Sequence, residues 1–241
     1  MSSRGGKAWR ELDVIHYRKS QPPPASLHQE KQKASGKYNL QDVVVQLQAD
    51  FHNKCYLCEE PKPSKIEVDH LQPNNNGTDR NAMFDWNNLF YSCGHCNGTK
   101  NGTWPILDCT DSGAFVLSKM SYRHFLDPHM RIRVVVDARA SDPATTNAAA
   151  LLNKIYGGRT PTRTLESANI LDKMLENCKA FFRDVERLAT ESDPVRQASL
   201  RRRISRGLAP EVGFTAIRAW QVIDAGFALQ FLPELQRLGY N

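Results

Sequence analysis

The sequence lacks any run of 18 or more apolar residues, so no transmembrane helix and no membrane partner are expected. Residues 1–7 (MSSRGGK) do not contain the apolar stretch of a secretory signal peptide, so we expect the protein in the cytoplasm. Internal repeats and long low-complexity tracts are also missing, which excludes a repeat architecture. The length of 241 residues favours one domain or two small ones.

The charge balance is mildly positive. Lys and Arg number 32 against 26 Asp and Glu, a formal net charge of +6. Such an excess favours an anionic partner such as nucleic acid, although many basic proteins bind nothing anionic. Hydrophobic residues make up 40% of the chain, enough for an ordinary core.

The chain divides into three regions, which together predict an α+β fold. Residues 1–38 are polar and contain three consecutive prolines, which predicts an extended arm, either a disordered tail or a segment that docks on a partner. Residues 39–110 begin with a helical apolar pattern and continue into a segment with little periodicity. Residues 111–241 predict short strands, the clearest over 132–136, followed by mainly helical stripes.

Four of the six cysteines form two CxxC pairs with 34 residues between them: Cys55 with Cys58, and Cys93 with Cys96. In a reducing compartment this spacing is typical of metal ligands. Four thiolates close a tetrahedron around zinc and leave no position for water, so the sequence predicts a structural zinc site made of four cysteines. The alternative is four unconnected buried cysteines.

Other residues near these pairs have less distinctive patterns. His95 lies inside the second pair and is a weaker candidate ligand. Cys109 and Cys178 have no partner at ligand spacing and are expected to be small apolar core residues.

The residues between and after the pairs carry a second pattern. Asp69-His70 follows a short strand pattern at 66–69, Asn87-Asn88 precedes another at 89–91, and Asn97 directly follows the second pair. This layout over residues 55–101 resembles the HNH endonuclease motif. The resemblance implies a ββα-metal core stapled by zinc, with a helix beginning right after the second CxxC.

The chemistry of phosphodiester hydrolysis assigns roles to these residues. His70 is the candidate base that activates water, because neutral imidazole accepts protons near pH 7. Asp69 and Asn97 offer the oxygen ligands that Mg²⁺ or Mn²⁺ prefers. The resemblance implies that Asn88 braces the site, with Asn87 as its rival, and Lys100 is a candidate phosphate contact.

The motif also departs from its name, because Asn97 stands where the final histidine is expected. Asparagine occurs there in the family, so the mechanism is expected to survive. The alternatives are that Asp69 and Asn97 only cap a turn and a helix, and that His70 is a structural hydrogen-bond donor.

The flanks resemble the HNH nuclease of Septu anti-phage systems, including its retron-associated relatives. The similar segments are residues 19–22 (KSQP), 125–129 (FLDPH) and 151–154 (LLNK). This resemblance implies an ABC-type ATPase partner and a role in bacterial antiviral defence. The competing interpretations are a zinc-knuckle module that binds without cutting, and a restriction-type HNH enzyme that acts alone.

Two polar clusters each have two alternative interpretations. The basic residues Arg201, Arg202, Arg203 and Arg206 form either a phosphate-binding patch or a solvated helix face. The pair at 127 and 129 (Asp and His) is either a second metal site or an ordinary polar loop. DNA is favoured over RNA as substrate, although an HNH core contacts mainly the phosphate backbone and does not decide between them.

Overall fold

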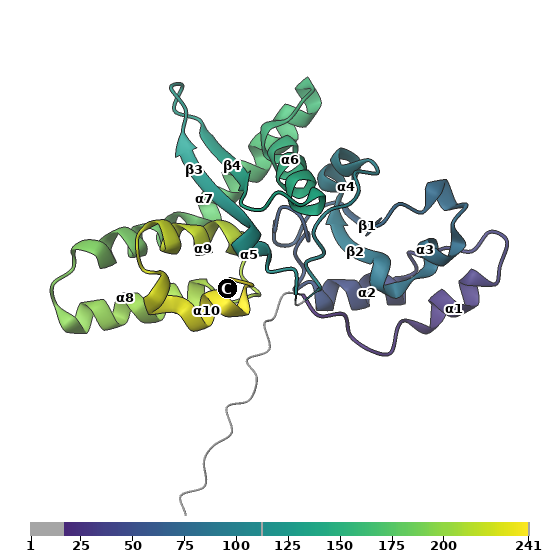
Figure 1. The fold of residues 1–241 in the computed structure, drawn as a ribbon, viewed down its shortest axis with the longest axis horizontal. Coiled ribbons are helices and arrows are strands. Elements are labelled where there is room, and N and C mark those ends of the chain that lie inside the picture. The colour runs from purple at the N-terminus through teal and green to yellow at the C-terminus, as the bar shows by residue number, and fades with distance from the viewer. Residues whose placement is uncertain (1–16, 112, 241) are drawn as a thin grey trace, which may run out of the picture.

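The computed structural model describes residues 17–111 and 113–240 (Figure 1). It combines helices with two small antiparallel sheets and ends in a helical region, which confirms the predicted α+β class. No helix among these described residues is long and apolar enough to cross a membrane. The elements in chain order are α1 (Ala25–Lys31), α2 (Gln41–Asp50), β1 (Ile66–His70), η1 (Asn75–Gly77), α3 (Arg80–Phe84), η2 (Trp86–Asn88), β2 (Leu89–Cys93), α4 (Gly94–Lys100), α5 (Val116–Lys119), β3 (Met120–Leu126), β4 (Ile132–Ala138), α6 (Pro143–Gly157), α7 (Pro161–Thr190), α8 (Pro194–Gly207), α9 (Thr215–Asp224), η3 (Ala228–Phe231) and α10 (Leu232–Arg237).

The β1–β2 hairpin and helix α4 carry the residues of the HNH-like motif. The strands pair antiparallel, with Asp69 opposite Phe90 and His70 opposite Leu89. Every residue of β2 is buried, because α2 and α4 both contact this strand. The two short strands expected from the sequence are therefore present, and each extends a little further than its apolar run.

The described part of the N-terminal arm is folded onto the core and is not extended throughout. Residues 25–31 form helix α1, whose Leu27 is buried. Ser20 Oγ donates a hydrogen bond of 2.6 Å to Asp50 at the end of α2, and Trp86 Nε1 donates to the Ser20 carbonyl at 3.0 Å. Residues 17–38 therefore pack against other parts of the same chain. Residues 1–16 lie outside the described residues.

The long helices of the C-terminal region begin at clear capping signals. Asp142, Thr160 and Asp193 precede α6, α7 and α8, and the side-chain oxygen of each accepts a hydrogen bond from a backbone N–H of the first turn. Each cap is followed by proline, whose fixed φ and missing N–H suit the first helical position. Helices α6 and α7 contact β4 and each other, and α8 runs beside α7 (Figure 1).

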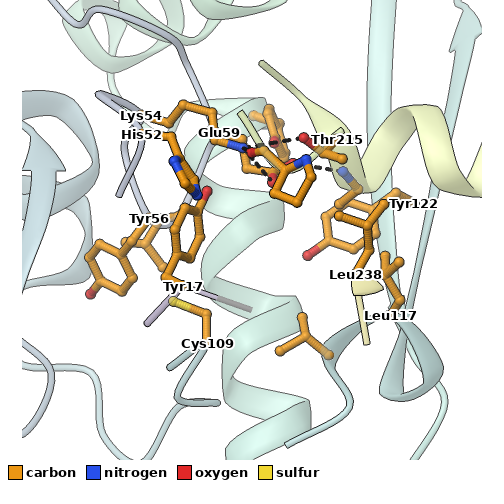
Figure 2. Close-up of a pocket in the computed structure, with 15 residues that line it drawn as sticks. Tyr17, His52, Lys54, Tyr56, Glu59, Cys109, Leu117, Tyr122, Thr215 and Leu238 are labelled. Carbon is orange, nitrogen blue, oxygen red and sulfur yellow. Dashed lines mark hydrogen bonds and ion pairs between the residues drawn. The ribbon is translucent and has the colours of Figure 1, made fainter. Parts of the chain in front are cut away.

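The C-terminal region also contacts the first CxxC loop directly. The ammonium of Lys54, only 1% exposed, donates to the carbonyls of Pro210 at 2.5 Å and Val212 at 2.9 Å. The backbone N–H of Phe214 donates to the Glu59 carbonyl at 3.1 Å. Figure 2 shows the pocket at this junction, where Lys54 and Thr215 point toward one another. The nuclease-like segment and the C-terminal helices therefore share one interface.

Candidate active site and metal centre

The four paired cysteines form one buried cluster. Their sulfur atoms all lie within 4.8 Å of one another, and Cys58 Sγ is 4.0 Å from Cys93 Sγ. Four sulfurs held by zinc at about 2.3 Å are separated by roughly 3.8 Å in a tetrahedron, so the cluster has nearly the right size. Burial and contact with the other thiols raise the pKa of Cys96 well above its usual range. A dication would stabilise the thiolates and offset this effect, so the residues fit a closed structural zinc site.

Local backbone geometry presents these sulfurs. Cys93 is the N-cap of α4, and its sulfur accepts a hydrogen bond from the backbone N–H of Cys96. In the first pair, the Glu59 N–H donates to the Cys55 carbonyl at 2.9 Å, with Glu59 in a left-handed conformation (φ 56°) that closes the turn. The Tyr56 N–H donates to the Tyr91 carbonyl on β2, which holds the two pairs together.

His95 is not part of the sulfur cluster. Its Nδ1 lies 2.9 Å from a Glu166 carboxylate oxygen on α7, and its Nε2 lies 2.9 Å from the Ile155 carbonyl on α6. Both ring nitrogens therefore face oxygen acceptors instead of a metal. His95 ties the second CxxC loop to the C-terminal helices, a link between distant segments that local spacing does not predict.

His70 lies at the end of β1 in a mostly buried setting, 8% exposed. Tyr38 contacts its ring edge-on, with centroids 4.5 Å apart. Burial lowers the pKa of His70 below its ordinary value, and the nearby charge of Lys100 acts in the same direction. The hydrogen bond to the Met83 carbonyl opposes this shift in part, and the net lowering of the pKa favours the neutral imidazole, the form a general base needs.

The hydrogen bonds of His70 indicate its tautomer. Its Nε2 lies 3.0 Å from the Met83 carbonyl, which only accepts hydrogen bonds, so Nε2 carries the proton in the neutral ring. The lone pair is then on Nδ1. The Asn74 amide nitrogen lies 3.3 Å from Nδ1 and 3.4 Å from Nε2. His70 thus has a defined proton-accepting atom, held in place by a carbonyl on the opposite side of the ring.

Asn88 braces the loop that follows His70. Its side-chain oxygen accepts from the Gln72 N–H at 2.7 Å, and its amide nitrogen donates to the carbonyls of Gln72 at 3.0 Å and Ala82 at 2.8 Å. Asn87 is exposed, and its backbone N–H donates to the Asp85 carboxylate. Of the two candidates, Asn88 has the bracing geometry.

Asp69 faces α4, on the opposite side of the strand from His70. Its carboxylate accepts a hydrogen bond of 2.6 Å from the Tyr56 hydroxyl and lies 3.3 Å from the Lys100 ammonium. Burial raises the pKa of Asp69, while Lys100 and Tyr56 lower it. The ammonium of Lys100 also donates to the His70 carbonyl at 2.5 Å.

The phosphate contact expected of Lys100 is not supported by this arrangement. Lys100 is 3% exposed and its charge is turned inward onto the strand. It lies one helical turn after Asn97, so the helix that presents the asparagine also carries the lysine inward. Lys100 acts on Asp69 and the His70 backbone.

Glu67 is a residue of this site that the motif pattern did not indicate. Its carboxylate accepts from the Asn97 amide nitrogen at 2.6 Å and forms an ion pair of 2.7 Å with Lys65. Residues two apart on a strand share a face, so Glu67 and Asp69 both point toward α4. The alternation of side chains along the strand is therefore the sequence signal that identifies Glu67. The Asn97 hydrogen bond uses its nitrogen, which leaves the amide oxygen for another partner.

Two other candidate clusters have structural partners. At the turn between β3 and β4, Asp127 accepts from the backbone of His129 and Arg131 and from the Arg133 side chain, so the possible second metal site is an ordinary polar turn. Arg203 forms a two-pronged contact with Asp184 on the neighbouring helix. The rest of the basic cluster, Arg201, Arg202 and Arg206, lies on the exposed face of α8.

Comparison with known proteins agrees with this geometry for one part of the chain. The HNH endonuclease family model matches residues 55–103, which include the sulfur cluster, β1, β2 and α4. No curated protein and no solved structure matches the chain. The match covers less than half of the chain and says nothing of the C-terminal helices. Residues 55–103 are thus similar to HNH endonucleases, which supports a nuclease-type function and a nucleic-acid substrate.

Proposed function

We propose that this protein is a metal-dependent endonuclease in which His70 is the general base. The observation that carries the proposal is the hydrogen bond from His70 Nε2 to the Met83 carbonyl, which leaves the basic lone pair on Nδ1. Water attacks the phosphorus, its proton passes to Nδ1, and a P–O bond of the backbone breaks. The leaving oxygen then takes up a proton from solvent.

Asp69 and Asn97 are the proposed holders of a catalytic Mg²⁺ or Mn²⁺. Both offer hard oxygen donors on the side of β1 that faces α4, and Glu67 adds a second carboxylate there. When bound, such an ion neutralises charge on the phosphoryl and leaving oxygens. Lys100 positions the Asp69 carboxylate. The zinc held by the four cysteines is structural in this proposal.

Cleavage assays test the proposal. We expect the wild-type protein to cut plasmid DNA with Mg²⁺ or Mn²⁺ and to stop after addition of a chelator. His70→Ala should bind nucleic acid and melt like the wild type but lose cleavage. Near wild-type cleavage by a folded His70→Ala protein contradicts the mechanism. A folded wild-type protein that binds but never cuts supports the zinc-knuckle binding module instead.

The substrate class is proposed to be DNA, and a panel decides it. Double-stranded DNA, single-stranded DNA and tRNA are incubated in parallel with wild-type and His70→Ala protein. Duplex DNA is expected to be cut fastest. Preferred cleavage of tRNA would move the proposal to RNA without changing the role of His70.

The proposed biological role is that of the effector in a cytoplasmic anti-phage complex with an ABC-type ATPase. The support is the resemblance of residues 19–22, 125–129 and 151–154 to the Septu nuclease. Nucleotide state would then control the nuclease by shifting a conformational equilibrium. Co-expression with the neighbouring ATPase, gel filtration, and cleavage with and without ATP test this. Separate elution with unchanged cleavage favours a restriction-type enzyme that acts alone.

A further inference from the structure

We infer that Lys154, Arg159 and Arg163, which lie outside the matched HNH segment, bind the phosphate backbone of the nucleic acid beside the active site. The inference rests on the proposed nuclease function and names the surface that holds its substrate. The motive is the position of Lys100, whose buried charge leaves the core without the phosphate contact expected of it.

A basic pocket lies where α4 meets the C-terminal helices. It encloses about 640 Å³ of empty space, part of it open to solvent. Lys154 comes from the last turn of α6, Arg159 from the following loop and Arg163 from the first turn of α7. The lining residues are Thr99, Lys100, Asn101, Thr103, Lys154, Arg159 and Arg163, and they include no carboxylate.

The charges of this pocket are partly uncompensated. Within residues 17–111 and 113–240, neither Lys154 nor Arg159 forms an ion pair, and Arg159 is exposed. Arg163 is paired with Glu166 at 3.0 Å and also donates to the His95 carbonyl at 3.1 Å. The first two cations are therefore available to an anion, while Arg163 is held in a fixed position between the helices.

The pocket adjoins the residues proposed to hold the catalytic metal. Lys100 lines it and reaches inward to Asp69. The guanidinium of Arg163 lies over Gly98 of α4, the residue after Asn97, where an added Cβ would be 2.4 Å from Arg163 Nη2. A phosphate in the pocket would thus lie next to the side of the β1–β2 hairpin that is proposed to hold the metal. A nucleic-acid backbone that runs from the pocket to this side would contact both the C-terminal helices and the hairpin.

A structural explanation for the same charges is also testable. Lys154 lies in the last turn of α6, where a cation interacts favourably with the helix dipole. That explanation requires a change in thermal stability when the charges are removed. Phosphate binding requires a change in affinity and in its salt dependence, because each neutralised phosphate contributes roughly −0.9 to the slope of log K against log salt.

The experiment measures binding with cleavage switched off. Both double variants are made in a His70→Ala background. The first is Lys154→Ala/Arg159→Ala. The control is Arg183→Ala/Arg187→Ala, which removes two exposed charges from α7 at a point about 30 Å along the helix from Arg163. The probes are a labelled 30-base-pair DNA duplex and a tRNA, titrated at several KCl concentrations. The probe that the His70→Ala protein binds more tightly shows whether DNA or RNA supplies the phosphates.

We expect the first double variant to bind roughly tenfold or more weakly at about 0.1 M salt, with a slope smaller by about two and an unchanged melting temperature. The control double variant should bind like its parent. Unchanged affinity and slope, or an equal loss in the control, overturns the inference while the nuclease function stands. If the His70→Ala parent binds neither probe even at low salt, the proposed function fails and this inference fails with it.

Discussion

At the residue scale, Asp69 is both a candidate metal ligand and the partner of a buried cation. Removing one member of a buried ion pair typically destabilises a protein by about 3–5 kcal/mol, because the other charge stays unpaired. Asp69→Ala would therefore mix a folding defect with a catalytic one. Asp69→Asn retains an oxygen for the Tyr56 hydroxyl and changes mainly the charge.

We predict that Asp69→Asn lowers cleavage by roughly 100-fold or more while zinc content is unchanged, since an amide oxygen binds a hard cation less strongly. High Mn²⁺ should recover part of the activity. Cleavage rates at increasing Mn²⁺ and elemental analysis of the purified protein measure both effects. Loss of zinc in this variant would show that the two metal sites are assigned wrongly.

Asn88 and Asn87 provide a matched pair. Asn88→Ala removes three hydrogen bonds from the loop after His70 and leaves two carbonyls and one N–H to find other partners. Each such bond contributes about 1 kcal/mol, so we predict a loss of roughly 2–3 kcal/mol in the free energy of unfolding, together with reduced cleavage. Asn87→Ala should change stability by less than about 0.5 kcal/mol. Denaturant melts of both variants test this, and equal effects would reject the bracing role.

At the element scale, the β1–β2 hairpin and α4 are held together by the two CxxC loops. We predict that Cys58→Ser abolishes tight zinc binding and unfolds residues 55–103, because metal binding in such a site supplies folding free energy. Elemental analysis and circular dichroism melts measure the two effects.

Cys109→Ser is the matched control for that variant. Cys109 lies outside the sulfur cluster and lines the junction pocket, so its replacement should leave one zinc per chain (Figure 2). A Cys58→Ser protein with normal zinc and normal melting would contradict the structural role of the site.

At the scale of the whole molecule, the C-terminal helices support the metal-binding loops. Lys54 and Glu59 flank the first CxxC pair and bind the backbone of residues 210–216. Lys173 on α7 forms an ion pair with Glu60 in the same loop. These contacts show that the C-terminal region has an intramolecular role.

We predict that Lys54→Met lowers the free energy of unfolding by about 3 kcal/mol, because it leaves buried carbonyls and the Glu59 carboxylate without their cation. Methionine retains most of the side-chain volume, so the loss reports on the charge. Lys62→Met, at an exposed position nearby, should be close to neutral. If both variants melt alike, the junction does not stabilise the core.

Short-range patterns determined much of this protein. The spacing of Cys55, Cys58, Cys93 and Cys96 predicted one four-cysteine site, because a CxxC turn places two sulfurs together by local geometry alone. The patterns at residues 66–69 and 89–91 predicted two short strands, and the resemblance to the HNH motif implied that they belong to one ββα core. The packing of residues 17–38 could not be predicted because apolar residues are sparse there, and Leu27 is buried in a region where α1 contacts α2 and α3.

Tertiary structure alone decided which partner each buried polar group has. The Met83 carbonyl determines the tautomer of His70, Asp69 turns Lys100 inward, and Glu67 engages Asn97. These partners come from separate elements, so no spacing rule along the chain relates them. A buried polar atom must find a hydrogen bond wherever the fold offers one. Residue type and spacing therefore predicted which side chains belong to the site, and only the packing of the elements decided what each of them contacts.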